Sequence, residues 1–409
     1  MKIMLKLAWR SLWRNWRRSL ITIAAIFFAV FLMTGMRGIQ KGTYAANIER
    51  AVELFTSYLQ IQEDTYFDTP TLRKSFKLNL ETIGYLKQNE KITGYAPRIM
   101  SDGLIGKDDN SFGAAIIAMN PEMEKGVSNI HEKVKKGNFI STKKPLGIVI
   151  GEKLADNLKV AVGDEVVILA SGYDGAMGNM KFTIEGTIRT GSDEFDRMSV
   201  FMTTRAANEL LSMNGRVSTV AVGLTSFEHL EEVKAELAGI LPGEKLKVLD
   251  WQELMPEMVQ SIEFDNASGL IYQFLLLLIV GFGILNTVVM SVTERSREFG
   301  VMLAIGTKKG IIIAAVFLET IFMSILGLAI GLVAGYAVNA YIVLNPIEIT
   351  GTSAEMYEQF GFIPQIHSSL TPEVFTLTTI STIVVVLLVF IYPAIKLSKL
   401  EALKGIRYV

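Results

Sequence analysis

Four long apolar runs dominate the pattern of hydrophobic and polar positions along this chain of 409 residues. Only the third run contains a charged side chain, Glu319. A helix crosses a bilayer with about 20 residues, so each run is predicted to be a membrane-spanning helix. The runs cover Leu20–Met36, Gly269–Val292, Ile311–Leu344 and Val374–Ile395.

In the segment between the first and second runs, apolar and polar residues alternate over shorter distances. It opens with a helical continuation of the first span over 42–55. Amphipathic stretches then predict helices at 152–158, 204–213 and 227–241, the last capped by Thr225. Clusters of β-branched residues predict strands between them, which together indicate a large α+β domain. The strands are expected at 57–62, 113–119, 147–151, 164–170, 181–188, 199–203, 217–224 and 245–250.

The distribution of charge, rather than the net charge of −1, orients the chain in the membrane. Residues 1–18 carry six basic and no acidic side chains, whereas 345–373 carries four glutamates and no basic one. Basic loops stay on the cytoplasmic side, so both termini and the loop at 293–310 are expected to be cytoplasmic. The expected fold class is an α-helical membrane protein with four transmembrane helices plus a large α+β extracytoplasmic domain inserted between helices 1 and 2.

These boundaries give the expected domain organisation. The N-terminal segment repeats tryptophan and leucine at helical spacing beside basic residues, which is typical of an amphipathic helix in the membrane interface. The expected order is a cytoplasmic amphipathic helix (1–18), TM1 (19–37), the extracytoplasmic, periplasmic domain (38–266), TM2 (267–292), a cytoplasmic coupling helix or loop (293–310), TM3 (311–344), a short extracytoplasmic loop (345–373), TM4 (374–395) and a cytoplasmic tail (396–409).

Composition argues against several kinds of chemistry. The chain has no cysteine, so it has neither a disulfide nor a cysteine nucleophile or metal ligand. Its three histidines, His131, His229 and His367, are scattered, and neither a P-loop nor a GxSxG motif is present. We expect no catalytic residue, no metal site and no cofactor in this chain, and no nucleic-acid partner.

A compact charged segment between the second and third runs is the main candidate for function. Glu294, Arg295, Arg297 and Glu298 lie within five positions. On a helix, the residues that follow form an apolar stripe, so the charges would set the register of a partner and the stripe would supply affinity. The alternative is an ordinary basic cytoplasmic loop. The stripe consists of Phe299, Met302, Leu303 and Gly306.

The third span carries two further signals. Gly327, Gly331 and Gly335 repeat every four residues and make a smooth helix face for close packing on a neighbouring helix. Glu319 lies about two turns from the cytoplasmic end of its span. It either extends to the membrane surface or binds a polar partner within the bundle and is functional.

A resemblance to a known family rests on the segment ERSREFGVMLAIG and the glutamate in the span that follows. Together they resemble the signature of the FtsX-like permease family of ABC transporters. The opening AWRSLWRNWRRSLIT and the tail YPAIKLSKLEALKGIRY are also similar to that family. The positions that match its signature are Glu294, Arg295, Glu298, Gly300, Ala304, Gly306 and Glu319.

Within the family, the external segments are more similar to the lipoprotein-releasing branch, the LolC/LolE type, than to the MacB-type efflux permeases. The similarity is carried by GIVIGEKLADNLKVAVGDEVVIL (147–169) and VFMTTRAANELL (200–211). In that branch, the hairpin after the VGDEVVIL strand can recruit a periplasmic lipoprotein chaperone. The corresponding stretch is 171–180, which makes Tyr173, Asp174 and Met177 the candidate hook residues.

The resemblance implies a dimer of permeases in the bacterial inner membrane, with two separate ABC ATPase subunits that bind ATP and magnesium. The second permease is a copy of this chain or a paralogue. The charged helix is then the handle that the ATPases move, and the cargo is a lipoprotein. Two alternatives are MacB-like efflux of amphiphiles or peptides with an adaptor, and FtsX-like signalling to a cell-wall hydrolase. The side chains expected to meet acyl chains, or otherwise membrane lipids, are Phe28, Phe31, Phe274 and Leu278.

Overall fold

The structure is a computed structural model that describes residues 10, 13–14, 16–241, 245–359 and 364–401. The chain divides into two compact units. The membrane unit comprises Met1–Tyr44, Ile262–Glu348 and Gln365–Val409, and the domain unit comprises Ala45–Ser261 and Ile349–Pro364. Most of the amphipathic helix predicted at 1–18 lies outside the described residues.

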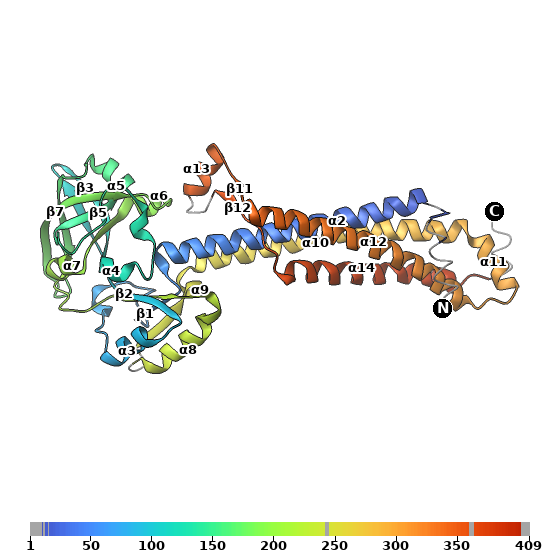
Figure 1. The fold of residues 1–409 in the computed structure, drawn as a ribbon, viewed down its shortest axis with the longest axis horizontal. Coiled ribbons are helices and arrows are strands. Elements are labelled where there is room, and N and C mark those ends of the chain that lie inside the picture. Colours follow the sequence, from blue (N-terminus) through green and yellow to red (C-terminus); the bar gives the residue numbers. More distant parts are fainter. Residues whose placement is uncertain (1–9, 11–12, 15, 242–244, 360–363, 402–409) are drawn as a thin grey trace. The chain divides into compact units, whose positions relative to one another are not determined.

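Four long helices build the membrane unit (Figure 1). Each is long and apolar enough to cross a membrane. The short helix α11 (Ser296–Ala304) follows the second of them, and β11 (Ile347–Glu348) pairs with β12 (Gln365–Ile366). The last helix runs beyond Pro393 to Ser398, so the proline lies inside it. The four helices are α2 (Trp16–Ala51), α10 (Pro256–Glu294), α12 (Lys309–Leu344) and α14 (Pro372–Ser398).

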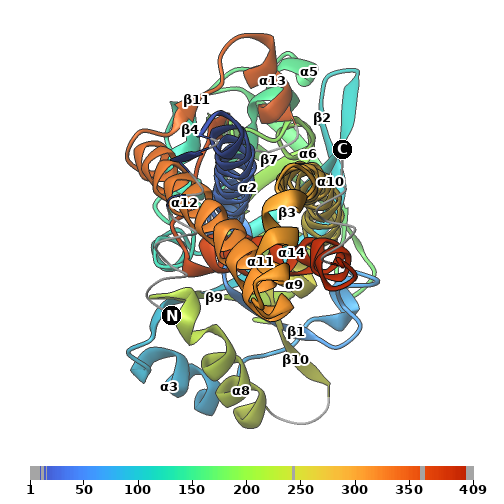
Figure 2. The same ribbon diagram turned by 90° about the vertical axis from the view of Figure 1, so that its right-hand side faces the viewer.

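The residue pattern of the bundle is that of a protein in lipid. Small and β-branched side chains are buried between the helices, for example Ala29 and Val30 of α2 with Val288 of α10. Large apolar side chains such as Phe28 and Phe282 are exposed on the outer faces. In water such an outer surface would be costly, whereas in hydrocarbon it is compatible with the surroundings. Figure 2 looks along the helices and shows α11 at the near end of the bundle.

A ten-stranded sheet is the framework of the domain unit. Its order is β10-β1-β9-β2-β3-β8-β5-β7-β4, and β6 pairs with both β2 and β7. The β3–β8 and β5–β7 pairs are parallel, and the other pairs are antiparallel. The strands are β1 (Leu59–Glu63), β2 (Ile92–Lys107), β3 (Asn110–Met119), β4 (Val134–Gly137), β5 (Gly147–Gly151), β6 (Glu165–Ser171), β7 (Met177–Ile188), β8 (Ser199–Thr203), β9 (Thr219–Leu224) and β10 (Leu246–Asp250).

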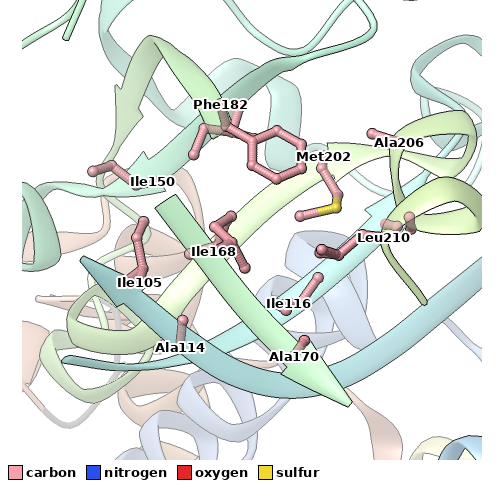
Figure 3. Close-up of a cluster of buried hydrophobic side chains, with 14 of the residues drawn as sticks. Ile105, Ala114, Ile116, Ile150, Ile168, Ala170, Phe182, Met202, Ala206 and Leu210 are labelled. Carbon is pink, nitrogen blue, oxygen red and sulfur yellow. The ribbon is translucent and has the colours of Figure 1, made fainter. Parts of the chain in front are cut away.

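The two largest hydrophobic cores on this sheet are covered by helices. Helices α3 (Leu80–Gln88) and α8 (Leu230–Ile240) pack on β1 and β9 through Leu86 and Leu237. Helices α5 (Glu152–Leu158) and α7 (Thr204–Leu211) belong to the second core, in which Figure 3 shows Phe182, Met202 and Leu210 gathered over the strands. The remaining helices are α4 (Pro121–Glu124), α6 (Asp193–Met198), α9 (Trp251–Leu254) and α13 (Thr352–Gln359).

The strands expected at 147–151 and 199–203 are confirmed at those bounds, and the other six predicted strands are shifted at their ends. Several elements were not predicted from the sequence, among them β2, β4 and α3. In β2, Pro97 and three glycines interrupt the apolar pattern. The expected cap on the 227–241 helix is wrong. Ser226 accepts from the Glu228 backbone N–H, and Thr225 instead donates to the Lys91 carbonyl.

Candidate coupling site of the membrane unit

The short helix α11 is set off from α10 by a break at Arg295, which lies outside helical geometry with φ −96° and ψ 7°. The Ser296 hydroxyl donates to the Val292 carbonyl across this break. At the other end, Gly306 takes φ +93°, and the Thr307 N–H closes on the Met302 carbonyl at 2.9 Å. Glycine adopts this left-handed conformation readily. The sequence therefore isolates a helix of about two and a half turns.

One face of α11 packs on the bundle of its own chain. The Phe299 ring is only 3% exposed, and Met302 and Leu303 pack against the same buried cluster as Val292 of α10 and Ile312 of α12. The stripe expected to give a partner affinity is therefore used inside the chain, at least for Phe299. The outward face has its own apolar residue, Ile305, which is 78% exposed. The other exposed residues between 297 and 308 are Arg297, Glu298, Val301, Ala304, Gly306 and Lys308.

Ion pairs connect α11 to α12 and to Arg14, which lies just before α2, and a neighbouring pair joins α2 to α10. Arg295 Nη1 lies 3.0 Å from a Glu319 oxygen on α12, and its Nε lies 3.2 Å from Glu298. Glu298 also pairs with Arg14 at 3.2 Å. One turn earlier, Arg18 of α2 donates two hydrogen bonds to Glu294 of α10, at 2.6 and 2.8 Å. The two pairs at Glu298 are solvated and individually weak, whereas the Arg295–Glu319 pair is mostly buried.

The environment of Glu298 favours its charged form. Partial burial raises the pKa of its carboxyl, but the hydrogen bond from Arg295 and the charge of Arg14 outweigh this effect. The pKa of Glu298 therefore lies below its ordinary value. The ion pair persists at neutral pH and is lost only in acid.

Glu319 binds a polar partner inside the bundle rather than extending to the membrane surface. Besides Arg295, it borders a cavity of about 10 Å³, close to the lower limit for one water molecule. The Thr22 and Thr287 hydroxyls share a 2.6 Å hydrogen bond nearby on α2 and α10. The lining residues are Arg18, Ser19, Thr287, Val288, Ser291, Val316, Glu319, Thr320 and Met323.

The three glycines of α12 lie against α2. A Cβ added to Gly327 or Gly331 would come within 2.8 Å of Ile26 or Val30, and one on Gly335 within 2.9 Å of Thr34. Such distances are far inside van der Waals contact, so the helices can approach this closely only because the side chains are absent. The repeat holds α12 and α2 together beside the Arg295–Glu319 pair.

The four apolar residues expected to face acyl chains lie on α2 and α10. Phe28, Phe274 and Leu278 are exposed, and Phe31 is half-buried with its ring stacked on Phe27 at 5.9 Å. Their positions fit lipid contact and fit a path for acyl chains equally well.

The candidate hook at 171–180 forms a tight hairpin between β6 and β7. The Gly172 N–H donates to the Ala176 carbonyl, and Asp174 accepts from the Ala176 N–H at 3.0 Å. Tyr173 packs on the second core of the domain unit, with Arg216 over its ring. Met177, the third candidate hook residue, is an apolar side chain that is 70% exposed.

A buried ion pair in the domain unit was not predicted from the sequence. Arg98 of β2 and Glu124 are both fully buried and bonded at 2.5 and 3.2 Å. Arg98 also donates to the Phe55 carbonyl at 2.6 Å and stacks on its ring. Phe55 belongs to the π-helical turn Val52–Thr56, which ends the continuation of α2. An arginine in a strand gives no signal of this role, because its partner is distant in sequence.

Comparison with known proteins places the chain in a family. Residues 19–240 match the MacB-like periplasmic core domain, and residues 270–402 match the FtsX-like permease C-terminal model. The chain belongs to this family of ABC transporter permeases. The resemblance noted in the charged segment and its flanks is thus confirmed.

The relatives of this permease include proteins of two named types. The lipoprotein-releasing system transmembrane protein LolC of Xylella fastidiosa (strain 9a5c) is 25% identical over 78% of each chain. The macrolide export ATP-binding/permease protein MacB of Nitrobacter winogradskyi is 22% identical over 78% of this chain and 49% of that protein. The periplasmic region of MacB from Actinobacillus actinomycetemcomitans aligns with a TM-score of 0.36 at 14% identity, over 52% of this chain and 94% of that one.

These relatives make the chain a permease of the LolC/MacB type, a multi-pass protein of the inner membrane that works with ATPase partners.

Proposed function

We propose that this permease converts ATP hydrolysis by separate cytoplasmic subunits into motion of its domain unit, and that this motion releases lipoproteins from the inner membrane. In this proposal both termini and α11 are cytoplasmic, and the domain unit is periplasmic, inserted between the first and second spans. The distribution of basic residues supports that orientation. ATP and magnesium bind to the partner subunits.

The single observation that carries the proposal is the arrangement of α11. Its inner face is fixed to the bundle by Phe299 and by the Arg295–Glu319 pair, while its outer face presents Ile305 beside the basic residues Arg297 and Lys308. A short rigid helix with one anchored and one free face can be gripped by a partner and can pass the displacement to the helices that it touches.

The long helices supply the path of the motion. α2 and α10 are 36 and 39 residues long and each continues without interruption from the membrane unit into the domain unit. At about 1.5 Å per residue, each is a rod of more than 50 Å. In the domain unit, Arg98, which is paired with Glu124, donates to the Phe55 carbonyl in the final turn of the α2 continuation, so movement of the helix would be transmitted to β2.

The relative LolC supports lipoprotein as the cargo, whereas the MacB relative supports efflux of another amphiphile. Purification of the complex from its native membrane, with mass spectrometry of the retained proteins, separates the two. We expect an ABC ATPase together with acylated lipoproteins. An ATPase with an adaptor protein and no lipoprotein would overturn lipoprotein release and favour efflux.

Replacement of the exposed residue on α11 tests the handle itself. We expect Ile305→Asp to abolish retention of the ATPase in this purification, because a charge replaces the apolar contact. Leu80→Asp, at an even more exposed leucine in the domain unit, is the matched control and should retain the ATPase. Equal retention by both variants would contradict the assignment of α11.

A further inference from the structure

A cavity of about 760 Å³ lies within the domain unit. Leu59 and Ile61 of β1 face the core under α3 and α8, so the alternate residues Gln60 and Gln62 face the opposite side, where the cavity lies. Its volume is within the range of about 300–1,000 Å³ that is typical of small-molecule sites. The strands β1, β2, β3 and β9 and the segment 66–73 contribute to its walls.

Two buried polar side chains in the cavity wall lack a partner. Gln62 and Thr219 are directly opposite each other on β1 and β9, and they are 2% and 1% exposed. Within the described part of the chain, neither Gln62 Nε2 nor Thr219 Oγ1 has a hydrogen-bond partner. Buried donors in folded proteins are nearly always paired. Neither atom is accessible to solvent, so a ligand that brings an acceptor satisfies both groups when their side chains turn into the cavity.

The remaining walls define the rest of that ligand. Apolar side chains and polar or charged side chains line the cavity in equal number, and the charged lining residues Arg73 and Asp102, both exposed, have opposite signs. The opposite signs give the lining no net charge to select a charged ligand, whereas the apolar part of the walls favours an apolar chain. The apolar lining side chains are Phe55, Tyr66, Phe67, Pro70, Leu72, Met100, Ala115, Ile116 and Leu254.

The geometry points to a binding site for a neutral acyl amide. We propose that its carbonyl oxygen accepts hydrogen bonds from Gln62 and Thr219 and that its apolar chain lies against Phe55 and Leu72. The acylated N-terminus of a lipoprotein and a free acyl amide share this chemistry. This inference rests on the proposed function in one respect, that the ligand of the site is the cargo of the permease. Binding itself needs no ATPase.

The cavity also borders the ends of both long helices. Phe55 and Thr56 lie in the turn that ends the continuation of α2, and Leu254 ends α9, just before α10 begins at Pro256. A displacement of either helix within the domain unit therefore changes the cavity wall. In this way ATP-driven motion would alter the affinity of the site for its ligand.

Photolabelling of the full-length chain in lipid nanodiscs tests the site. The probe is an N-octanoyl dialanine amide with a diazirine in its acyl chain, and the readout is the probe concentration that half-saturates labelling of residues 55–73. We expect Thr219→Val and Gln62→Leu each to raise this concentration about three- to tenfold, the usual effect of losing one neutral hydrogen bond. The ether analogue of the probe lacks the carbonyl. It should bind to the unchanged chain as weakly as the original probe binds to the two variants.

Thr82→Val is the matched control, because the Thr82 hydroxyl is also buried without a partner in the described structure but lies on α3, outside the cavity. It should label like the unchanged chain. In each of the three substitutions, the polar atom that is removed forms no hydrogen bond in the described structure. The thermal unfolding temperature of the chain should therefore not fall. Equal half-saturation in all variants, or labelling confined to the four long helices, would overturn the site.

Unlabelled competitors then distinguish the two sources. Stronger competition by a synthetic acylated lipoprotein N-terminus identifies lipoprotein as the cargo, and stronger competition by octanoyl amide identifies a free amphiphile, and either result supports the site. Loss of the ATPase interaction with intact labelling would contradict the proposed function and leave this site standing.

Discussion

The two units each contain an arginine–glutamate pair at a mechanically important position, and the two pairs differ in their surroundings. Arg98–Glu124 in the domain unit is fully buried and has further hydrogen bonds to Phe55 and Ser128. Arg295–Glu319 in the membrane unit retains some exposure and continues into the solvated pairs of Glu298. The first arrangement fixes a helix end in one geometry. The second joins several helices through contacts that can be exchanged.

The largest effect is expected from breaking the buried pair. Arg98→Met leaves Glu124 as an unpaired buried charge and frees the Phe55 carbonyl, so the free energy of unfolding of the domain unit should fall by about 3–5 kcal/mol. Denaturant titration followed by Trp251 fluorescence measures this. The double variant Arg98→Met/Glu124→Leu should be more stable than either single variant, and simple addition of the two losses would refute the pairing argument.

A smaller loss is expected where the membrane unit relies on close packing rather than charge. Gly331→Leu inserts a side chain where even a Cβ would come within 2.8 Å of Val30. We expect a loss of about 1–3 kcal/mol, measured as earlier thermal unfolding in detergent. Gly283→Leu on α10 is the control, since a Cβ there meets no atom within 4 Å. Similar losses for both would mean that the repeat on α12 has no special role.

The smallest effect concerns the solvated pairs of α11. The pKa of Glu298 is lowered in the folded chain, so its pairs contribute stability above the ordinary glutamate pKa of about 4.3, and this contribution is lost as the pH falls through the folded value. Solvent screening limits it to about 1 kcal/mol or less. The unfolding temperatures of the unchanged chain and of Glu298→Gln should therefore differ at pH 7 and converge in acid, below the folded pKa of Glu298. A difference in unfolding temperature that grows in acid would contradict the prediction, because it would mean that the charged form of Glu298 destabilises the folded chain.

Much of this architecture was predictable because it depends on local pattern. The four apolar runs and the glycine repeat follow from residues close together in sequence, as does the strand at 147–151. The start of the coupling helix was placed too early, because Glu294 ends α10 and Arg295 lies at the break. The direction in which Phe299 faces was not predictable, because an amphipathic helix can turn its apolar stripe toward its own bundle or toward a partner. The packing on Val292 decides between these only in three dimensions.

The residues that sequence reasoning missed share one property. Arg98 and Glu124 are 26 positions apart, and Gln62 and Thr219 belong to strands that meet only in the folded sheet. A polar residue in a strand normally indicates a solvent-exposed face, so Arg98, Gln62 and Thr219 resemble ordinary surface positions, and Glu124, in the short helix α4, does so too. Only the sheet order reveals that these side chains lie inside the domain unit.

The most direct test of the coupling role measures cargo release and ATP hydrolysis in the same reconstituted complex. The variant Glu319→Gln removes the charge that Arg295 binds while conserving size and insertion into the bundle. Glu348→Gln, at an exposed glutamate of β11 outside α11, is its matched control. The account predicts that Glu319→Gln continues to hydrolyse ATP while release per ATP falls at least tenfold. Unchanged release per ATP in Glu319→Gln would contradict the coupling role of the α11 anchor.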